Sequence, residues 1–360
     1  MKVAVLGFGT VGRGVYEMIE KSSFLETGPV LVLPKECDKD FMVTSIDEIV
    51  NDKSVDAVVE CMGGVETAFK FTSACLKSGK HLVTSNKALV AAKGLELRDI
   101  AKQHNALLLF SAACGGAIPV LHNISIAKNT DEIIQCGGIL NGTTNFILSS
   151  ILDGRFKSYD SALKEAQKLG YAEADPTADV SGMDTMRKVM LLSAVAFDKL
   201  PTDGIFNEGI ENIDLCPKGY GTVKLVGSCG IAGESVYAYV EPVICKKDSL
   251  YAAVNSNFNA AHYIGKNSGL ITLMGQGAGR YPTASAVLRD LTDLCKNPYS
   301  MLSDKCSAVK ADNSIIKHKY LVSDGEKAHI TDAISVYEMH TNAKQMRSEG
   351  KKLFFAAIEE

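Results

Sequence analysis

The sequence predicts an α/β fold, in which a doubly wound parallel sheet is followed by a second, α+β domain. Through the first 125 residues, continuous apolar runs alternate with helical patterns, which is typical of parallel strands covered on both faces. A glycine-rich turn directly follows the first apolar run. After about residue 126 the alternation gives way to longer helices and strands. Since one domain has about 100–200 residues, a chain of 360 residues is expected to form two.

The first domain, residues 1–125, is expected to alternate strands with helices. Its strands are expected at Val3–Leu6, Val30–Leu33, Asp56–Glu60, His81–Thr84 and Ala106–Phe110. Its helices are expected at Val11–Glu20, Glu66–Lys77 and Ala88–Gln103. One more helix is expected much later, over about Thr283–Leu294, and residues 282–302 are expected to return to this domain.

The second domain, residues 126–281, is predicted to be an α+β domain that binds the substrate. It is expected to begin with a strand at Ile133–Leu140 and to be strand-rich over residues 223–275. Its helices are expected at Thr143–Leu152, Tyr159–Leu169 and Ser181–Phe197. Residues 303–360 form a more polar C-terminal segment with a strand–helix–strand pattern, whose role the sequence leaves open.

The composition is that of an ordinary globular protein. Hydrophobic residues make up 46% of the chain, charged residues 22%, and the net charge is −4. Both signs are interspersed, so no nucleic-acid partner is expected. No apolar run is long enough for a membrane span or a signal peptide. The ten cysteines are widely spaced, which favours reduced thiols in the cytoplasm. The sequence contains no HxH or HExxH spacing, so a zinc site is not expected.

A dinucleotide-binding turn is predicted where the first strand meets the first helix. The stretch GFGTVG matches GxGxxG in the strand–turn–helix context that the motif requires. Such a turn lets the backbone approach a pyrophosphate, which the helix N-terminus stabilises. The alternative is a glycine-rich turn without a ligand. The arrangement is Rossmann-like, and the candidate cofactor-binding residues are Gly7, Phe8, Gly9, Thr10, Val11 and Gly12.

The end of the second expected strand leaves the choice between NAD and NADP open. Lys35 could neutralise a 2′-phosphate, whereas Glu36 could accept hydrogen bonds from a 2′-hydroxyl. The pair favours NADP slightly.

Two later segments also follow strands of the first domain. Lys87, in Thr84-Ser-Asn-Lys, is expected to point toward the cofactor crevice, although a solvated surface lysine is the alternative. Cys114 lies in a glycine-rich segment and could be a nucleophile, but a small cysteine beside glycines is more often inert packing. Further candidate cofactor-binding residues are Ser85, Lys87, Gly115 and Gly279.

A cluster of carboxylates precedes a lysine in the second domain. Glu173, Asp175, Asp179 and Asp184 fall within twelve residues, and Asp184 and Lys188 share a helix face through their i, i+4 spacing. A surface ion pair worth about 0.2–0.5 kcal/mol is the alternative. The helix turns apolar after the lysine, which favours a buried site. Carboxylates could bind the ammonium group of an amino-acid substrate, and a lysine could donate a proton to an aldehyde oxygen.

Together these motifs resemble the homoserine dehydrogenase family along roughly residues 1–300. The most specific stretches are GGILNGTTNFIL and the GYAE-DP-D-G-D pattern with its following lysine. All the matching stretches are GFGTVG (7–12), VVECMGG (58–64), GKHLVTSNKA (79–88), CGGAIPVL (114–121), GGILNGTTNFIL (137–148), GYAEADPTADVSGMD (170–184) and GQGAGRYPTASAVLRDL (275–291).

The resemblance implies NAD(P)-dependent interconversion of L-aspartate 4-semialdehyde and L-homoserine, in the biosynthesis of threonine, isoleucine and methionine. It implies Lys188 as the proton donor, Asp184 close to the transferred proton, and Lys87 as a second active-site lysine. It implies Glu173 and Asp179 as substrate-binding carboxylates. A homodimer or higher homo-oligomer, built through the central domain, is implied as well.

The resemblance also implies a sodium-like cation held largely by backbone oxygens of Ser111, Cys114, Gly116 and Ile118. The family usually has an acidic residue in place of Ser111. The segment between the first helix and Asp56 is short, and the segment after about residue 303 is too short for a complete regulatory ACT domain. Threonine feedback through such a domain is therefore not expected.

Two other functions remain open from the sequence. A semialdehyde dehydrogenase would act through a thiohemiacetal on Cys114, and substitution of that cysteine by serine would abolish its activity. A non-catalytic dinucleotide sensor would bind NADPH without turnover and would not need the lysine–carboxylate cluster.

Overall fold

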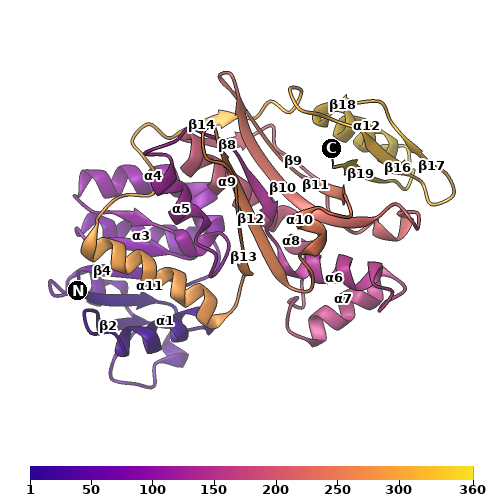
Figure 1. Cartoon of the computed structure of the whole chain (residues 1–360). Coiled ribbons are helices and arrows are strands. Elements are labelled where there is room, and N and C mark those ends of the chain that lie inside the picture. The colour runs from indigo at the N-terminus through magenta and orange to yellow at the C-terminus, as the bar shows by residue number, and fades with distance from the viewer. Residues whose placement is uncertain (360) are drawn as a thin grey trace. The chain divides into compact units, whose positions relative to one another are not determined.

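The structure is a computed structural model that describes residues 1–359, and it divides into two compact units. Unit 1 contains Met1–Ile126 and Gly277–Ser307. Unit 2 contains Ala127–Gln276 and the residues from Ala308 onward. Figure 1 shows the helices and strands of both units along the chain.

Unit 1 contains a six-stranded sheet in the order β3-β2-β1-β4-β5-β6. Every pairing along this order is parallel, as predicted. The order places β1 beside β4, so the sheet is built from two halves that meet at a switch point, where ligands bind beyond the carboxyl ends of the strands. The strands are β1 (Lys2–Leu6), β2 (Glu26–Leu31), β3 (Met42–Val43), β4 (Ala57–Glu60), β5 (His81–Thr84) and β6 (Leu108–Leu109).

The second strand lies earlier in the chain than the sequence predicts. It spans Glu26–Leu31 rather than Val30–Leu33, and its pairing with β1 has an irregularity between Val3 and Val5. A Cβ atom at Gly28 would lie 3.0 Å from the carbonyl oxygen of Val3. The predicted boundary is wrong because Gly28 and Pro29 look like strand breakers, whereas the irregular pairing accommodates both.

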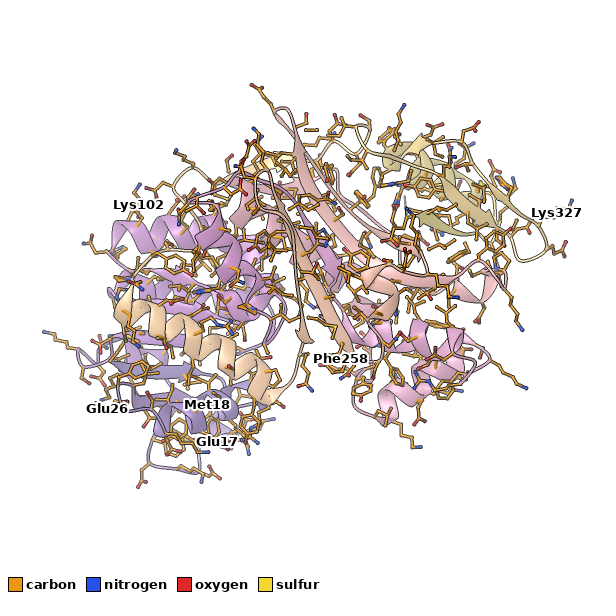
Figure 2. The ribbon with its side chains drawn as sticks, viewed as in Figure 1. Glu17, Met18, Glu26, Lys102, Phe258 and Lys327 are labelled. Atoms are coloured by element: carbon orange, nitrogen blue, oxygen red, sulfur yellow. The ribbon has the colours of Figure 1, made fainter. Side chains whose placement is uncertain are left out.

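Six helices of unit 1 accompany this sheet, and one comes from the far end of the chain. They are α1 (Thr10–Glu20), α2 (Ile46–Val50), α3 (Glu66–Lys77), α4 (Lys87–Gln103), α5 (Val120–Ala127) and α11 (Arg280–Lys296). A Cβ atom at Gly14 would lie 2.8 Å from Arg280 Cγ, so α1 and α11 pack closely. Arg280 also forms an ion pair with Glu17, which is labelled in Figure 2.

Unit 2 is built around a nine-stranded sheet. Its main order is β13-β12-β7-β10-β11-β19-β16-β17, and β9 (Phe206–Asn207) pairs with β11 off this path. The central strands are antiparallel. Strands in the main order are β7 (Ile133–Ile139), β10 (Thr222–Ala232), β11 (Ser235–Cys245), β12 (Phe258–Gly265), β13 (Gly269–Gln276), β16 (Tyr320–Ser323), β17 (Ala328–Ile330) and β19 (Phe354–Ile358).

Helix α9 (Met183–Phe197) packs against this sheet and is almost entirely buried in its second half. A Cβ atom at Gly227 on β10 would lie 2.5 Å from Val189 Cγ2, so helix and strand are in close contact. The other helices of unit 2 are α6 (Gly142–Leu152), α7 (Tyr159–Lys168), α8 (Thr177–Val180), α10 (Leu250–Ala253) and α12 (Val336–Ser348).

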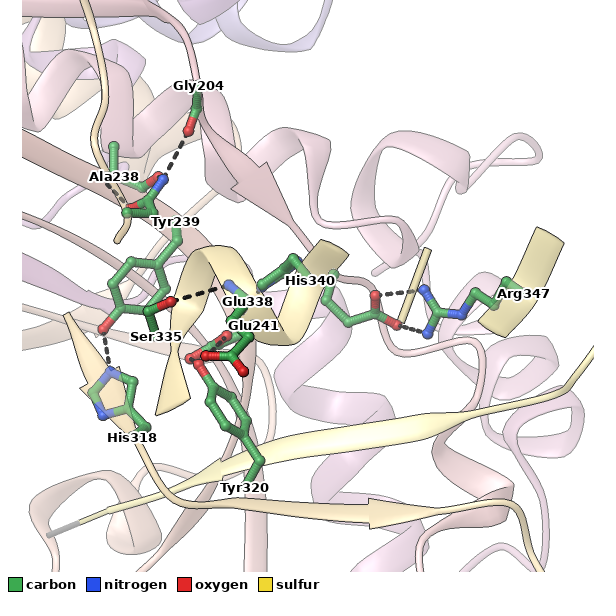
Figure 3. A network of polar contacts seen from close by, with 12 residues as sticks. Gly204, Ala238, Tyr239, Glu241, His318, Tyr320, Ser335, Glu338, His340 and Arg347 are labelled. Carbon is green, nitrogen blue, oxygen red and sulfur yellow. Dashed lines mark hydrogen bonds and ion pairs between the residues drawn. The ribbon is translucent and has the colours of Figure 1, made fainter. Parts of the chain in front are cut away.

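The C-terminal segment is part of the sheet of unit 2. Strand β19 pairs in parallel with β11 and antiparallel with β16. Glu241 on β11 is fully buried, and its carboxylate contacts Nε2 of His340 at 3.0 Å and the hydroxyl of Tyr320 at 3.3 Å. Figure 3 shows this network beside the bidentate contact of Arg347 with a carboxylate. Since an unpaired buried carboxylate is costly, Glu241 requires the C-terminal helix and strand.

Among residues 1–359, no helix combines the length and the apolar character needed to cross a membrane. All ten cysteines are free thiols.

Candidate functional site

The glycine-rich turn of unit 1 has the geometry of a phosphate-binding loop. Gly7 has φ +94°, which favours glycine, and a Cβ atom at Gly12 would lie 2.1 Å from the carbonyl oxygen of Gly7. In contrast, a Cβ atom at Gly9 would meet no atom within 4 Å. Gly9 is the N-cap of α1 and no side chain caps this end of the helix. The turn therefore leaves open space and unpaired N–H groups for an anion.

A buried carboxyl group connects the loops that follow β4 and β5. Glu60 ends β4 and accepts hydrogen bonds from Met62 N at 2.8 Å, Thr84 Oγ1 at 2.5 Å and Asn86 Nδ2 at 3.4 Å. The same Asn86 amide donates to the carbonyl oxygen of Gly64 at 2.7 Å. Both loops thus lie together at the carboxyl edge of the sheet. Neither Glu60 nor Asn86 is among the sequence-predicted site residues.

Lys87 and Ser85 lie at the same edge. Lys87 is the first residue of α4, and Asn86 caps this helix by accepting a hydrogen bond from Leu89 N at 3.1 Å. The backbone N–H of Ser85 donates to the carbonyl oxygen of Glu60 at 3.2 Å. Lys35 lies elsewhere, exposed in the short helical turn Pro34–Glu36 that comes after β2.

The segment around Cys114 is buried. Cys114 itself has 0% exposure, and Gly115 and Gly116 have φ values of +89° and +55°. A Cβ atom at Gly116 would lie 2.5 Å from the backbone of Gly277, so this segment touches the one that leads to Gly279 and α11.

The predicted lysine–carboxylate pair of unit 2 exists and is buried. Lys188 Nζ lies 2.7 Å from Asp184 Oδ2 and donates to the carbonyl oxygen of Leu140 at 2.6 Å. Asp184 is 5% exposed and Lys188 8%. This low exposure excludes the alternative of a surface ion pair. Burying each charge costs several kcal/mol unless its hydrogen bonds are satisfied, so the pair depends on its other partners.

Asn141 links this pair to a further carboxylate. Its Nδ2 donates to Asp179 Oδ1 at 2.7 Å and to Asp184 Oδ2 at 2.9 Å. Its Oδ1 caps α6 by accepting a hydrogen bond from Thr144 N at 2.9 Å. Asn141 was not predicted as a site residue. An asparagine before an apolar helix indicates an N-cap, but its two acidic contacts come from residues about forty positions later and have no local signal.

Glu173 lies in a loop that is held near the start of α6. The hydroxyl of Thr143 donates to the carbonyl oxygen of Tyr171 at 2.5 Å, and Gln167 Nε2 donates to that of Glu173 at 3.1 Å. The side chain of Glu173 is exposed, and its carboxylate has no hydrogen-bond partner within residues 1–359. Asp175 forms only a local turn with Thr177. Unit 2 therefore brings Asp179, Asp184 and Lys188 together and leaves the carboxylate of Glu173 available at the surface.

This cluster has the groups needed to bind an ammonium ion and to transfer a proton. Carboxylates attract a cationic amino group, and a lysine held at fixed distance can donate to an oxygen atom in its reach. Among the described residues no group of three or more His, Cys, Asp or Glu side chains has the geometry of a metal site.

Substituting Asn141 tests the bridging amide. In Asn141→Ala the helix loses its cap and two carboxylates lose their shared donor, which should lower the free energy of unfolding by about 1–3 kcal/mol. In Asn141→Asp the cap is kept, but a third carboxylate enters the cluster, so its destabilisation should be larger at pH 7 than at about pH 4, where carboxylates become protonated. Thermal unfolding of both variants measures this. Wild-type stability in both would contradict the bridging role.

Family models match two consecutive parts of the chain. The model described as "Homoserine dehydrogenase, NAD binding domain" matches residues 7–111, and the one described as "Homoserine dehydrogenase" matches residues 119–292. The curated homoserine dehydrogenase of Bacillus subtilis is 36% identical, over 82% of this chain and 73% of its own length. That of Corynebacterium glutamicum is 38% identical, over 82% of this chain and 72% of its own length.

Solved structures give the same result. The homoserine dehydrogenase from Thiobacillus denitrificans has a TM-score of 0.86 at 28% identity, covering 100% of this chain and 98% of its own. A hyperthermophilic archaeal homoserine dehydrogenase in complex with NADPH has a TM-score of 0.73 at 25% identity, covering 83% of this chain and 99% of its own. By sequence and by fold, the chain belongs to the homoserine dehydrogenase family and is an NAD(P)-dependent oxidoreductase.

Proposed function

We propose that unit 2 binds and protonates the amino-acid substrate through Lys188, Asp184, Asp179 and Glu173, in the interconversion of L-aspartate 4-semialdehyde and L-homoserine. The observation that carries this proposal is the buried contact of 2.7 Å between Lys188 and Asp184. A lysine in that position is held by its neighbours rather than by solvent, as a proton donor requires.

The bound nicotinamide would supply the hydride for aldehyde reduction, or accept it for alcohol oxidation. During reduction the carbonyl electron pair moves to oxygen, and the ammonium of Lys188 donates the proton that completes the alcohol. Asp184 keeps the ammonium in place through its 2.7 Å contact, while the carbonyl group of Leu140 fixes a second N–H direction. The oxidation direction reverses each transfer, so Lys188 then accepts the proton.

The substrate carries an ammonium group next to its carboxylate. Glu173 is proposed to bind this ammonium, because its carboxylate is exposed while its backbone is held by Gln167. Asp179 is proposed to line the same pocket, with its orientation set by Asn141. Lys87 is proposed as the second active-site lysine, since it begins α4 at the carboxyl edge of the sheet of unit 1.

The roles in unit 2 are tested by Lys188→Met, which keeps the length of the side chain and removes its proton. Turnover of L-homoserine with NAD(P)+ should fall by a factor of about 10² or more. The Kd for NADPH, measured by fluorescence, should stay within about twofold because the dinucleotide binds unit 1. Lys168→Met, an exposed lysine on α7, serves as the matched control. Turnover above about a tenth of the wild-type value in Lys188→Met would overturn the assignment.

For the cofactor, the glycine turn at residues 7–12 is proposed to hold the pyrophosphate, with Ser85, Lys87, Gly115 and Gly279 as further contacts. We propose that the protein prefers NADP to NAD. Lys35 is exposed beside the end of β2, and the neighbouring Glu36 carboxylate is engaged by the N–H of Leu33 at 3.4 Å. That contact leaves Lys35 better placed than Glu36 to meet the ribose substituent.

Lys35→Ala tests the preference. Loss of one exposed cation–phosphate contact should raise the Kd for NADP+ by about fivefold and leave that for NAD+ unchanged. Lys53→Ala is the control, because Lys53 lies before β4, at the amino edge of the sheet. Equal effects of Lys35→Ala on both cofactors would contradict a role in reading the 2′-phosphate.

A monovalent cation, sodium, is proposed at the backbone oxygens of Ser111, Cys114, Gly116 and Ile118. Two observations support it. The left-handed glycines give this buried segment a tight turn. Asp290 on α11 accepts the N–H of Ser111 at 2.8 Å and places a carboxylate beside the segment. Thermal stability measured in sodium chloride and in choline chloride tests the site, and equal stability in both would contradict it.

A second copy of the chain is the partner proposed for unit 2. Strand β13 is an edge of the nine-stranded sheet, and its side chains Leu270 and Met274 are 54% and 63% exposed. Phe258, labelled in Figure 2, is 39% exposed at the start of the paired strand. Exposed apolar side chains along one sheet edge favour association.

A cytoplasmic location is inferred from the ten free thiols. Cell fractionation tests this location. No nucleic-acid or membrane partner is proposed.

Charge on that edge should prevent the association. Wild-type protein is expected to sediment at twice the chain mass of 38.5 kDa or more. The double variant Leu270→Glu, Met274→Glu should sediment as a monomer, because burying two carboxylates costs more than the apolar contact provides. Leu250→Glu, at an exposed leucine on α10, is the control. A double variant with wild-type mass would place the interface elsewhere.

A further inference from the structure

Glu60 is a carboxyl group without a charged partner at the position where the cofactor is proposed to bind. Its residue exposure is 0%, and within the described chain its hydrogen-bond donors are neutral: one backbone N–H, one hydroxyl and one amide. A buried carboxylate normally has a cationic partner. Glu60 has no such cationic partner, so a contribution to stability does not explain why this carboxyl group is buried at the end of a strand.

The hydrogen bonds of Glu60 hold together two loops that line the switch point. Oε1 accepts from Met62 N and Asn86 Nδ2, and Oε2 accepts from Thr84 Oγ1. The loop after β4 also lies against the glycine turn, since a Cβ atom at Gly7 would meet the carbonyl oxygen of Cys61 at 3.1 Å. Loops after β1, β4 and β5 are therefore in one connected arrangement around this carboxyl group.

The position of Glu60 in the sheet indicates which half of the dinucleotide it would lie beside. The strand order places β1, β2 and β3 in one half of the sheet and β4, β5 and β6 in the other. The first half reads the adenosine ribose through residues after β2. The second half, where Glu60 ends β4, is left for the nicotinamide. The nicotinamide ring carries a positive charge when oxidised and none when reduced.

Burial makes the charge of Glu60 variable near neutral pH. Desolvation raises the pKa of this carboxyl group to about 7, against the opposing effect of the three hydrogen bonds. Of the groups around it, the thiol of Cys61 stays neutral, since burial and the charge of Glu60 raise its pKa to about 12. The residues of β1 and β5 that flank Glu60 are uncharged, α4 begins with Lys87, and α3 begins with the exposed Glu66.

We propose that Glu60 is a positioning residue for the nicotinamide half of the cofactor, and that its ionisation sets the relative affinity for oxidised and reduced dinucleotide. The ionised carboxyl group attracts the cationic oxidised ring and gives the reduced ring nothing in return. Binding of the oxidised dinucleotide is therefore accompanied by release of a proton from Glu60 to solvent, and binding of the reduced one is not. The inference rests on the dinucleotide lying at this edge, as proposed above.

The direction of the pH effect follows from this linkage. Below the pKa of Glu60 the group is neutral and does not distinguish the two rings. As pH rises through it, the ionised group stabilises the bound oxidised form but not the reduced form, so the ratio of Kd for the reduced to the oxidised cofactor increases. A change of half a pKa unit between the two complexes corresponds to about a threefold change in this ratio.

The experiment measures Kd for NADH and NAD+ with the full chain, from about pH 5.5 to pH 8.5. The pair NADPH and NADP+ is measured as well, because a phosphate monoester titrates near pH 6 and would add its own pH dependence. In the wild type the ratio should rise by about threefold or more. In Glu60→Gln it should be independent of pH, while the neutral amide keeps the size of the side chain. Glu20→Gln, an exposed carboxylate at the end of α1, should behave like the wild type.

A second variant keeps the test informative if Glu60→Gln does not fold. Thr84→Val removes a hydrogen bond that lowers the pKa of Glu60, so the midpoint of the pH dependence should move to higher pH. A purely structural Glu60 would not shift this midpoint. A pH-independent ratio in a wild type that binds both cofactors overturns this inference alone. A wild type that binds no dinucleotide overturns the cofactor assignment together with it.

Discussion

The buried contact between Lys188 and Asp184 is the constraint around which unit 2 is arranged. Two charges removed from water are stable only when each has its full set of partners. Leu140 supplies a carbonyl oxygen to the lysine, and Asn141 supplies an amide N–H to the aspartate. Strand β7 must therefore end, and α6 must begin, directly beside the first turns of α9. The NGTT segment and the aspartate–lysine spacing are one structural unit, although about forty residues separate them.

The glycine turn of unit 1 differs from this buried ion pair, because its polar groups are left without partners. It leaves backbone N–H groups unpaired at the start of α1, with open space beside Gly9 that an anion could fill. In unit 2 the charges of Lys188 and Asp184 are buried together with their partners. In unit 1 the N–H groups of the glycine turn carry partial positive charges that have no partner in the turn itself. The proposed reaction uses both arrangements, because the phosphates of the cofactor must be able to leave while the proposed proton donor must stay in place.

Local patterns predicted the elements that are set by local forces. The bounds expected for α3, Glu66–Lys77, and for β5, His81–Thr84, agree with the structure because apolar periodicity and the flanking turns define both. The α/β fold was confirmed for the same reason. Strand β2 was placed too late, since its pairing with β1 carries Gly28 and Pro29 through an irregularity. Asn141 and Glu60 were missed because most of their partners are distant in sequence, and an asparagine before a helix or a glutamate at the end of a strand looks like an ordinary terminus.

The C-terminal segment shows how a buried charge can make a region indispensable without giving it a chemical role. Glu241 lies on β11, inside the sheet of unit 2, and its partners His340 and Tyr320 both come from the C-terminal segment. The sheet that supports α9 therefore needs the segment to satisfy one of its own carboxylates. Because α9 carries Lys188 and Asp184, the segment stabilises the framework of the proposed proton donor, although it lies well beyond the family motifs in the sequence.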